Sequence, residues 1–179
     1  MLRHTARRAT NSTIRRVILC GIVVGALSTL LVSCSSYTEL SRAIDQAESL
    51  AEENPNKALE IISNIDKSQL RSNEIKARYA LIYSEVSYYN RMLVNSDSLT
   101  RIAVAYYDKS NHHHERARAY FQHGMTLQLA GALPEAILAL REAHNSLDKY
   151  KDNRLEGVVY RLEGDIYRAS YLYRNSYNA

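Results

Sequence analysis

The stretch ARAYFQHGMTLQLAGALPEAILALREAHNSL, residues 117–147, decides the fold class, because it predicts two helices joined by a tight turn. Gly131 suits the position just after a helix, where a left-handed backbone is common. Pro134 suits the first turn of the next helix, where the amide hydrogen that proline lacks has no partner anyway. Apolar and small residues recur at helical spacing on both sides, so the stretch predicts an antiparallel helix pair.

The rest of the chain carries the same signals. Glycine and proline are scarce after Cys34, while alanine, leucine, glutamate and arginine are common, which favours helices. Apolar residues recur at helical spacing over 37–53, 57–65, 70–90, a segment capped by Ser96 and reaching Tyr107, 114–130, 134–147, and from Leu155 onward. No stretch alternates as a strand would. The sequence predicts an all-α fold of about seven helices in antiparallel pairs.

The N-terminus has the three zones of a bacterial export signal. Residues 1–16 carry five arginines and no acidic residue, and residues 17–32 form an almost unbroken apolar run. A basic leader, a short apolar run and small residues are typical of a secretory signal. This run is shorter than the roughly 20 residues that a membrane-spanning helix needs.

Leu31-Val32-Ser33-Cys34 resembles the lipobox of bacterial lipoproteins. The resemblance implies cleavage before Cys34, a diacylglyceryl group on its sulfur and a further acyl chain on the freed amine. Because each buried methylene contributes about 0.8 kcal/mol, several chains hold a protein on a membrane without a spanning helix. Ser35, in place of aspartate, favours the outer membrane, facing the periplasm, by the same resemblance. Surface exposure, an ordinary signal peptide and an uncleaved anchor are the alternatives.

Removal of the signal changes the charge of the chain. The full sequence has 23 basic and 19 acidic residues and a net charge of +4. Five basic residues precede Cys34, so 18 basic and 19 acidic residues remain, a net charge of −1. Such a chain lacks the positive charge that favours nucleic-acid binding, and we expect none. Cys20 leaves with the signal and Cys34 carries lipid, so we expect no disulfide.

The helix pair at 117–147 resembles a tetratricopeptide repeat, which recurs every 34 residues or about that. The domain prediction is a signal peptide over 1–33, a lipidated tether over 34–37 and a repeat domain over 38–179. The resemblance implies a TPR-like right-handed superhelix, an α-solenoid, in which small residues let paired helices approach. The residues expected to pack the repeats are Gly124, Leu127, Gly131, Ala136, Leu140, Ala143, Gly164 and Tyr167.

A further copy of the repeat begins at Gly164, which follows Gly124 by more than the length of one tetratricopeptide repeat. We attribute the difference to an insertion around 151–154. Tyr171 and Tyr173 lie where the turn of this copy is expected, so the last repeat is expected to be incomplete at the chain end. Upstream, 40–65 and 75–107 resemble two degenerate copies that lack the glycine.

By the same resemblance, the first helix of each repeat lines a concave groove. Counting from Gly124 and Gly164 places eight residues there: Arg118, Phe121, Gln122, Met125, Gln128, Arg161, Asp165 and Arg168. Arginines beside amide and aromatic groups suit a peptide ligand, because charge-assisted hydrogen bonds fix its register. The alternative is an ordinary solvated helix face.

His112, His113 and His114 raise the question of a metal site. Adjacent histidines point in different directions, whereas a tetrahedral site needs ligands one helical turn apart or from two elements. The run falls in a predicted loop, so we expect solvated side chains and no metal. The sequence has no nucleophile motif, P-loop or dinucleotide-binding glycine motif, so we expect neither catalysis nor a cofactor.

These features favour a membrane-anchored lipoprotein with tetratricopeptide repeats that binds a protein or peptide in its groove. One alternative is the sensor part of a longer regulator without its output part, because some longer members of this group continue into such a part. The other is a lipoprotein that captures glycans. Exposed aromatic residues on a long insertion would favour glycan capture, and the sequence offers none.

Overall fold

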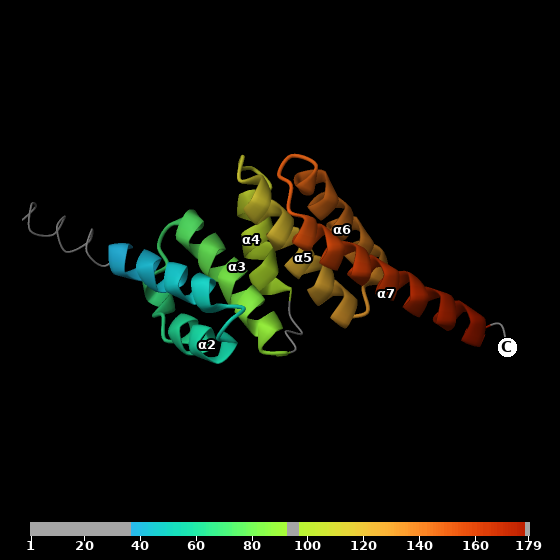
Figure 1. Ribbon diagram of the computed structural model, residues 1–179, viewed down its shortest axis with the longest axis horizontal. Helices are drawn as coiled ribbons and strands as arrows, with labels where there is room; N and C mark the ends of the chain where they lie inside the picture. The colour runs from blue at the N-terminus through green and yellow to red at the C-terminus, as the bar shows by residue number, and fades with distance from the viewer. Residues whose placement is uncertain (1–36, 93–96, 178–179) are drawn as a thin grey trace, which may run out of the picture. The chain divides into compact units, whose positions relative to one another are not determined.

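A computed structural model describes residues 37–92 and 97–177 of the chain, with side chains as far as Tyr171. Within these residues every regular element is a helix, which confirms the predicted all-α class. After a first helix over 37–50 come α2 (Pro55–Ser63), the short 3-10 helix η1 (Lys67–Gln69), α3 (Asn73–Tyr89), α4 (Ser98–Tyr107), α5 (His113–Leu129), α6 (Leu133–Leu147) and α7 (Asn153–Tyr177) (Figure 1).

Residues from Arg42 onward form one compact unit, and the residues before Arg42 belong to another. The contacts discussed below lie within the unit that begins at Arg42. Cys34, the predicted signal and most of the predicted tether lie outside the described residues. None of the described helices is both long enough and apolar enough to cross a membrane.

The helices α3, α5 and α7 start at equal intervals, whereas the intervals between the starts of α2, α4 and α6 are unequal. α3 begins at Asn73, α5 at His113 and α7 at Asn153, so the interval from α3 to α5 equals the interval from α5 to α7. This interval, called here the period of the chain, is longer than the roughly 34 residues of a tetratricopeptide repeat. Both intervals exceed that length, whereas an insertion confined to 151–154 would lengthen only the second.

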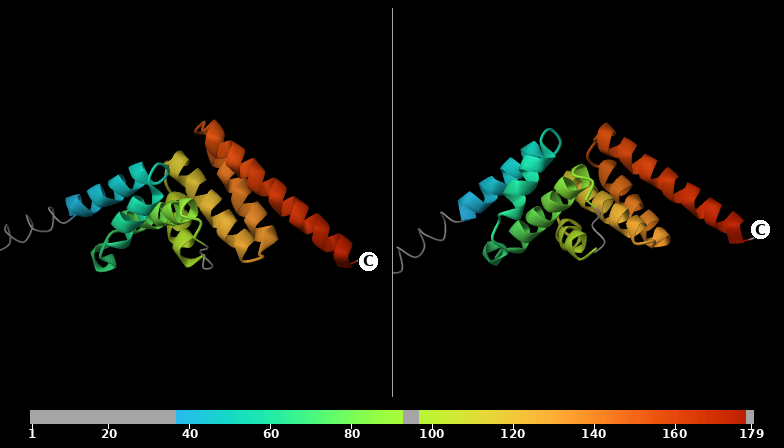
Figure 2. Two further views of the ribbon diagram at one scale, coloured as in Figure 1. Left: turned by 60° about the horizontal axis from the view of Figure 1, so that its bottom comes forward. Right: turned by 90° about the horizontal axis from the view of Figure 1, so that it is seen from below.

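Successive helices pack against one another in chain order. α5 contacts α6 most extensively, and it also contacts α3, α4 and α7. Figure 2 shows α5, α6 and α7 side by side in both of its views. The core of this region consists of Ala117, Phe121, Ala136, Leu140, Ala143, Leu147, Val159 and Ile166, all buried. Leu127 packs against this core from its edge.

Gly124 lies where α5 and α6 cross closely. A Cβ atom at this position would lie 2.8 Å from Cδ2 of Leu140 and 3.3 Å from the carbonyl oxygen of Ala136. Real Cβ atoms do not approach other atoms as closely as the first of these distances, and Leu140 is fully buried, so it has little room to move. Glycine is therefore required for this spacing of the two helices.

Gly131 closes α5. Its φ of 78° is in the left-handed region. The amide of Ala132 donates to the carbonyl oxygen of Leu127 at 2.9 Å, which completes a Schellman motif and turns the chain into α6. α3 ends with the same bonding pattern, but there Arg91 takes the left-handed backbone, with a φ of 54°.

Helix starts follow the capping side chains. Oγ of Ser72 accepts a hydrogen bond from the amide of Ile75 at 3.1 Å, so α3 begins at Asn73, later than the apolar pattern alone predicts. Ser96, the predicted cap of α4, lies outside the described residues. Asp97 occupies the N-cap position of that helix.

α7 departs from the prediction in two ways. The sequence predicts close packing at Gly164 and Tyr167, but no described atom lies within 4 Å of a Cβ built on Gly164, and Tyr167 is 61% exposed. The sequence also predicts a turn at 171–173, but α7 is continuous from Asn153 to Tyr177. Tyr171 lies one period after Gly131, and a tyrosine disfavours the left-handed backbone that ends α5. The helix therefore continues.

Candidate functional site

The helices α3, α5 and α7 border two clefts that adjoin each other. The larger cleft, about 570 Å³ in volume, is also bordered by the helix over 37–50 and the turn after it. The smaller cleft, about 370 Å³, runs along the end of α3, the second half of α5 and the first half of α7. Tyr88, Phe121, Val158 and Arg161 border both clefts. The two clefts therefore form one continuous surface, which we call the groove.

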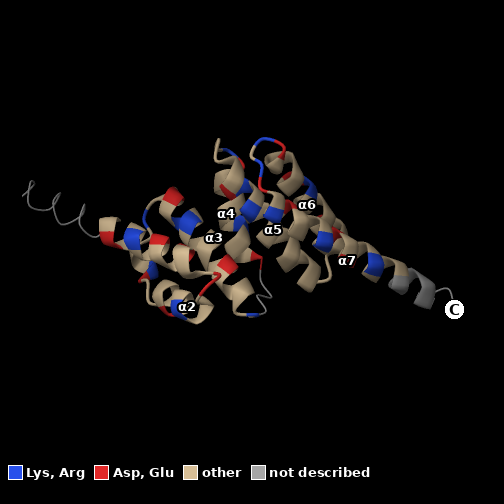
Figure 3. Ribbon diagram, viewed as in Figure 1, with Lys and Arg blue, Asp and Glu red and all other residues tan. Residues whose placement is uncertain are grey.

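The larger cleft, called here the acidic cleft, carries more carboxylates than cations. Its charged lining consists of Glu48, Glu52, Glu53, Glu85, Asp152, Arg118, Arg154 and Arg161, beside His114. Five carboxylates and three guanidinium groups give a formal charge of −2 with the histidine neutral. Along the described helices as a whole, acidic and basic residues are interspersed, so this local excess of negative charge is a property of the cleft (Figure 3).

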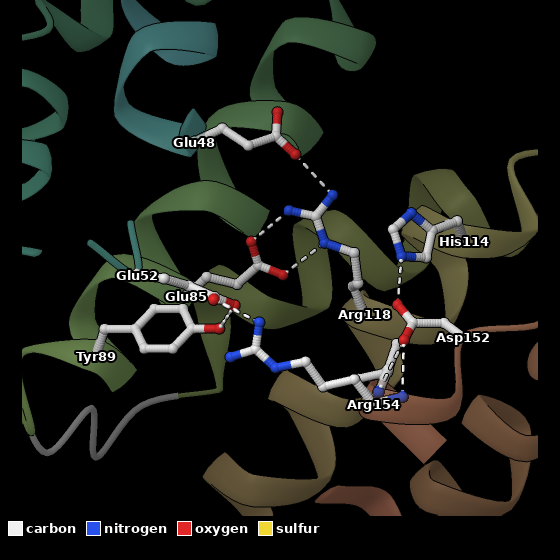
Figure 4. Close-up of polar contacts among 9 residues, drawn as sticks. Glu48, Glu52, Glu85, Tyr89, His114, Arg118, Asp152 and Arg154 are labelled. Carbon is white, nitrogen blue, oxygen red and sulfur yellow. Dashed lines mark hydrogen bonds and ion pairs between the residues drawn. The ribbon is translucent and has the colours of Figure 1, made fainter. Parts of the chain in front are cut away.

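Arg118 joins three helices in the wall of the acidic cleft (Figure 4). Its Nε and Nη2 donate to the two carboxylate oxygens of Glu85 at 2.7 and 2.5 Å, and its Nη1 donates to Oε1 of Glu48 at 2.6 Å. The side chains of Arg118 and Glu85 are only 16% and 11% exposed. Burial opposes the charge of Arg118, but the charges and hydrogen bonds of Glu85 and Glu48 outweigh burial and raise the pKa of Arg118.

The sequence predicts Arg118 as a ligand contact, and the structure gives its guanidinium two partners within the protein. Three of its nitrogen atoms already donate to carboxylates. Such a bidentate pair fixes the spacing of α3 and α5. Arg118 therefore supports the wall of the groove.

A second ion pair connects the turn after the helix over 37–50 with α7. Nη1 of Arg154 donates to Oε2 of Glu52 at 2.5 Å, and the hydroxyl of Tyr89 donates to Oε1 of Glu52 at 2.6 Å (Figure 4). The hydrogen bond from Tyr89, and then that from Arg154, lower the pKa of Glu52. Glu52 and Arg154 are exposed, so this pair contributes orientation more than stability.

His114 holds the start of α7 near the start of α5. Its Nε2 lies 3.0 Å from Oδ2 of Asp152, and its ring stacks on Tyr150 with the centroids 4.6 Å apart. Asp152 also caps α7, because its Oδ1 accepts from the amide of Leu155 at 2.9 Å. Burial would raise the pKa of Asp152, but the Leu155 amide and His114 outweigh burial and lower it.

The prediction that the histidine run lies in a loop is wrong for two of its members. His112 is the N-cap residue, whereas His113 and His114 are the first two residues of α5. The helix begins earlier than the apolar pattern predicts, because polar residues can occupy a first helical turn. Among the described residues, no group of three histidine, cysteine or acidic side chains could hold a metal ion.

Gln122 is a polar residue buried in the wall of the acidic cleft. Only 4% of the residue is exposed, and its Oε1 has no hydrogen-bond partner among the described residues. A buried acceptor without a partner costs about 1–3 kcal/mol. A donor supplied by a ligand in the cleft would remove this cost.

The smaller cleft, called here the apolar cleft, has an aromatic and aliphatic floor. The rings of Tyr88 and Phe121 meet edge to face, with centroids 6.1 Å apart and planes at 86°. The apolar side chains that complete the lining are Met92, Met125, Leu129, Val158 and Leu162.

Two arginines stand at the borders of the apolar cleft. Nη2 of Arg161 donates to the hydroxyl of Tyr88 at 3.2 Å. Neither Arg161 nor Arg91 pairs with a carboxylate among the described side chains. The apolar cleft therefore has positive charge available at its rim.

The structure brings seven of the eight predicted groove residues to the groove. These are Arg118, Phe121, Gln122, Met125, Gln128, Arg161 and Asp165. Arg168 borders neither cleft and is paired with Asp165 instead. The sequence could not exclude Arg168 from the groove, because Arg168 lies one helical turn after Asp165 on α7 and residues at this spacing share a helix face.

Sequence reasoning missed the contribution of α3 and of the first helix. Tyr88 and Glu85 lie one period before Gln128 and Met125, so the true period would have identified them. Glu48 and Glu53 lie at the end of the first helix and the turn after it, and no repeat spacing marks them. Their place in the acidic cleft depends on tertiary packing.

Comparison of the chain with protein-family models, with curated proteins and with solved structures gave no match. The function of the groove is therefore argued from its own side chains.

Proposed function

We propose that this protein is a membrane-anchored scaffold that binds a peptide segment of another protein in the groove and carries out no catalysis. The observation that carries the proposal is the pair of adjoining clefts, which combine an apolar floor with a buried acceptor that lacks a donor and a cation that has no carboxylate partner among the described side chains. Phe121 and Met125 offer apolar contact, and Gln122 and Arg161 offer an acceptor and a cation. Binding sites typically combine an apolar lining with a few such polar groups.

The size of the groove supports a peptide ligand. Volumes of about 570 and 370 Å³ are within the range of ligand pockets, and the two clefts lie side by side as successive side chains of one peptide require. The ion pairs of Arg118 hold the walls before a ligand arrives. A preformed groove loses less conformational entropy on binding.

The proposed architecture is a TPR-like right-handed superhelix. Antiparallel pairs in chain order, equal intervals between the starts of α3, α5 and α7, and a glycine at a close crossing support this architecture. The period of the chain departs from that of a tetratricopeptide repeat by being longer.

The proposed location is the periplasmic face of the outer membrane, with Cys34 carrying the lipid anchor. A Cys34→Ala variant expressed in a bacterium and labelled with a fatty-acid analogue should lose all label. Unchanged labelling would rule out the anchor. The unlabelled variant should leave the membrane fraction, because the remaining signal segment is too short for a comfortable span.

Peptide binding is tested with the full chain purified in detergent and a displayed library of random peptides. The double variant Met125→Lys with Arg161→Glu should reduce recovery of the enriched peptides at least about tenfold, which corresponds to about 1.4 kcal/mol. Arg141→Glu is the matched control, since Arg141 is exposed on α6 and borders neither cleft. Equal recovery by the wild type, the double variant and the control would overturn the proposal.

A further inference from the structure

We propose that the groove selects peptides in which a basic side chain accompanies a large apolar one: the basic side chain enters the acidic cleft and the apolar one enters the apolar cleft. This inference rests on the proposed peptide-binding function and names the class of peptide.

The charge balance of the acidic cleft favours a cation. Glu48 and Glu85 share the guanidinium of Arg118, so this partly buried group carries two negative charges and one positive charge. Glu53 adds an exposed carboxylate that has no partner among the described residues. Attraction between unlike charges is strong where burial lowers the effective dielectric constant. A lysine or arginine of a ligand would neutralise the excess.

Gln122 gives an independent indication of the same chemistry. Its side-chain oxygen is buried in the wall of the acidic cleft without a donor. An ammonium or guanidinium group brings several N–H donors and no acceptor. A basic side chain can therefore satisfy this acceptor once the wall of the cleft shifts enough to expose it, whereas an ionised acidic side chain has no donor to offer.

The apolar cleft favours an apolar side chain of the ligand over a basic one. Its charged lining is Arg91, Arg161 and Asp165. Asp165 is paired with Arg168, and neither arginine of the lining has a carboxylate partner among the described side chains, so the border repels a second cation. Its floor of Tyr88, Phe121 and Met125 offers contact to a leucine, methionine or phenylalanine side chain. Attraction in one cleft and repulsion in the other fix which side chain occupies which cleft.

The experiment compares two pools of short synthetic peptides of equal length on the full chain in detergent. Both pools contain leucine, phenylalanine and methionine among serine and alanine; one adds lysine and arginine, the other aspartate and glutamate. We expect the basic pool to bind at least about tenfold more tightly. Added salt should weaken this preference, because exposed charges such as Glu53 are screened.

Two variants locate the effect. Glu53→Lys should weaken binding of the basic pool about tenfold, whereas Asp148→Lys, which reverses an exposed charge outside both clefts, should not. Gln122→Leu should preserve the circular dichroism spectrum and keep or raise the unfolding midpoint, because it removes a buried acceptor that has no partner, yet weaken the basic pool several-fold.

Each outcome decides between the two proposals. Equal binding of the two pools, or preference for the acidic pool, would overturn the charge selection and leave peptide binding intact. Equal effects of Glu53→Lys and Asp148→Lys would show that net charge, not the acidic cleft, selects the peptide. Binding of neither pool, with no peptide enriched from the random library, would overturn both proposals.

Discussion

Arg118 is the side chain on which the wall of the groove depends most. It pairs with Glu85 on α3 and with Glu48, which lies 70 residues earlier in the chain. A buried charge that loses its partner is far more costly than the pair is stabilising. The residue therefore determines whether the acidic cleft keeps its shape, although it does not itself offer a free charge to a ligand.

Arg118→Met should lower the free energy of unfolding by about 3 kcal/mol, because Glu85 would remain buried without its counterion. Urea unfolding followed by circular dichroism measures the loss. Adding Glu85→Gln to the same chain should recover part of it, because the neutral amide removes the unpaired charge. If Arg118→Met costs no more than Arg141→Met on the exposed side of α6, the buried pair is not what holds the wall.

At the scale of the helices, Gly124 and Gly164 occupy equivalent places in successive repeats but face different surroundings. Gly124→Ala should destabilise the protein by about 1–3 kcal/mol, because the new Cβ would meet the buried Leu140. Gly164→Ala should stabilise it by about 1 kcal/mol, because alanine favours a helix and the site is open. Thermal unfolding of both variants measures the difference, and effects of the same sign would contradict it.

The charge of Asp152, which caps α7, makes the stability of the protein depend on pH. Its pKa is lowered in the folded protein, so its stabilisation is present above the unfolded pKa of about 3.9 and is lost as pH falls through the lower folded value. Asp152→Asn keeps the capping oxygen without the charge. The wild type should therefore exceed this variant in urea midpoint at neutral pH, and the difference should begin to shrink below about pH 4 and vanish as pH falls through the lower folded pKa. A constant difference at all pH values would show that the charge has no role.

Helix positions follow local signals, and for that reason the sequence predicts most of them. Gly131 and Pro134 mark one turn without reference to the rest of the chain. α7 runs past its predicted end because Tyr171, which corresponds to Gly131 at the end of α5, does not favour the left-handed backbone that ends a helix. The groove is harder to predict. Glu48 and Glu53 enter it through packing between distant helices, and the shorter period of a tetratricopeptide repeat hides Tyr88.

For the whole unit from Arg42 onward, stability should vary along the chain. Each helix contacts mainly its neighbours in chain order, so a helix packed on both sides opens less often than one with an open face. α5 and α6 are packed between other helices, whereas no described residue covers Gly164 and Tyr167 on α7.

Hydrogen exchange measured by mass spectrometry should show the slowest amides in α5 and the first half of α6, and faster exchange in the second half of α7. The full chain with Cys34 intact is the sample. Uniform exchange across α5, α6 and α7 would mean that the unit opens as a single cooperative body, in place of the graded stability that neighbour contacts predict.

The contact between Arg154 and Glu52 spans 102 residues of chain, whereas α5 and α6 are joined by a short turn from Leu129 to Leu133. Hairpins of neighbouring helices close short loops and form fast, while a contact between distant segments must wait for the chain between them to compact. The Arg154–Glu52 bond should therefore be among the last to form during folding. A newly made chain would acquire its helices early and its groove only at the end, so under the proposed function a partner peptide would be recognised only after folding is complete.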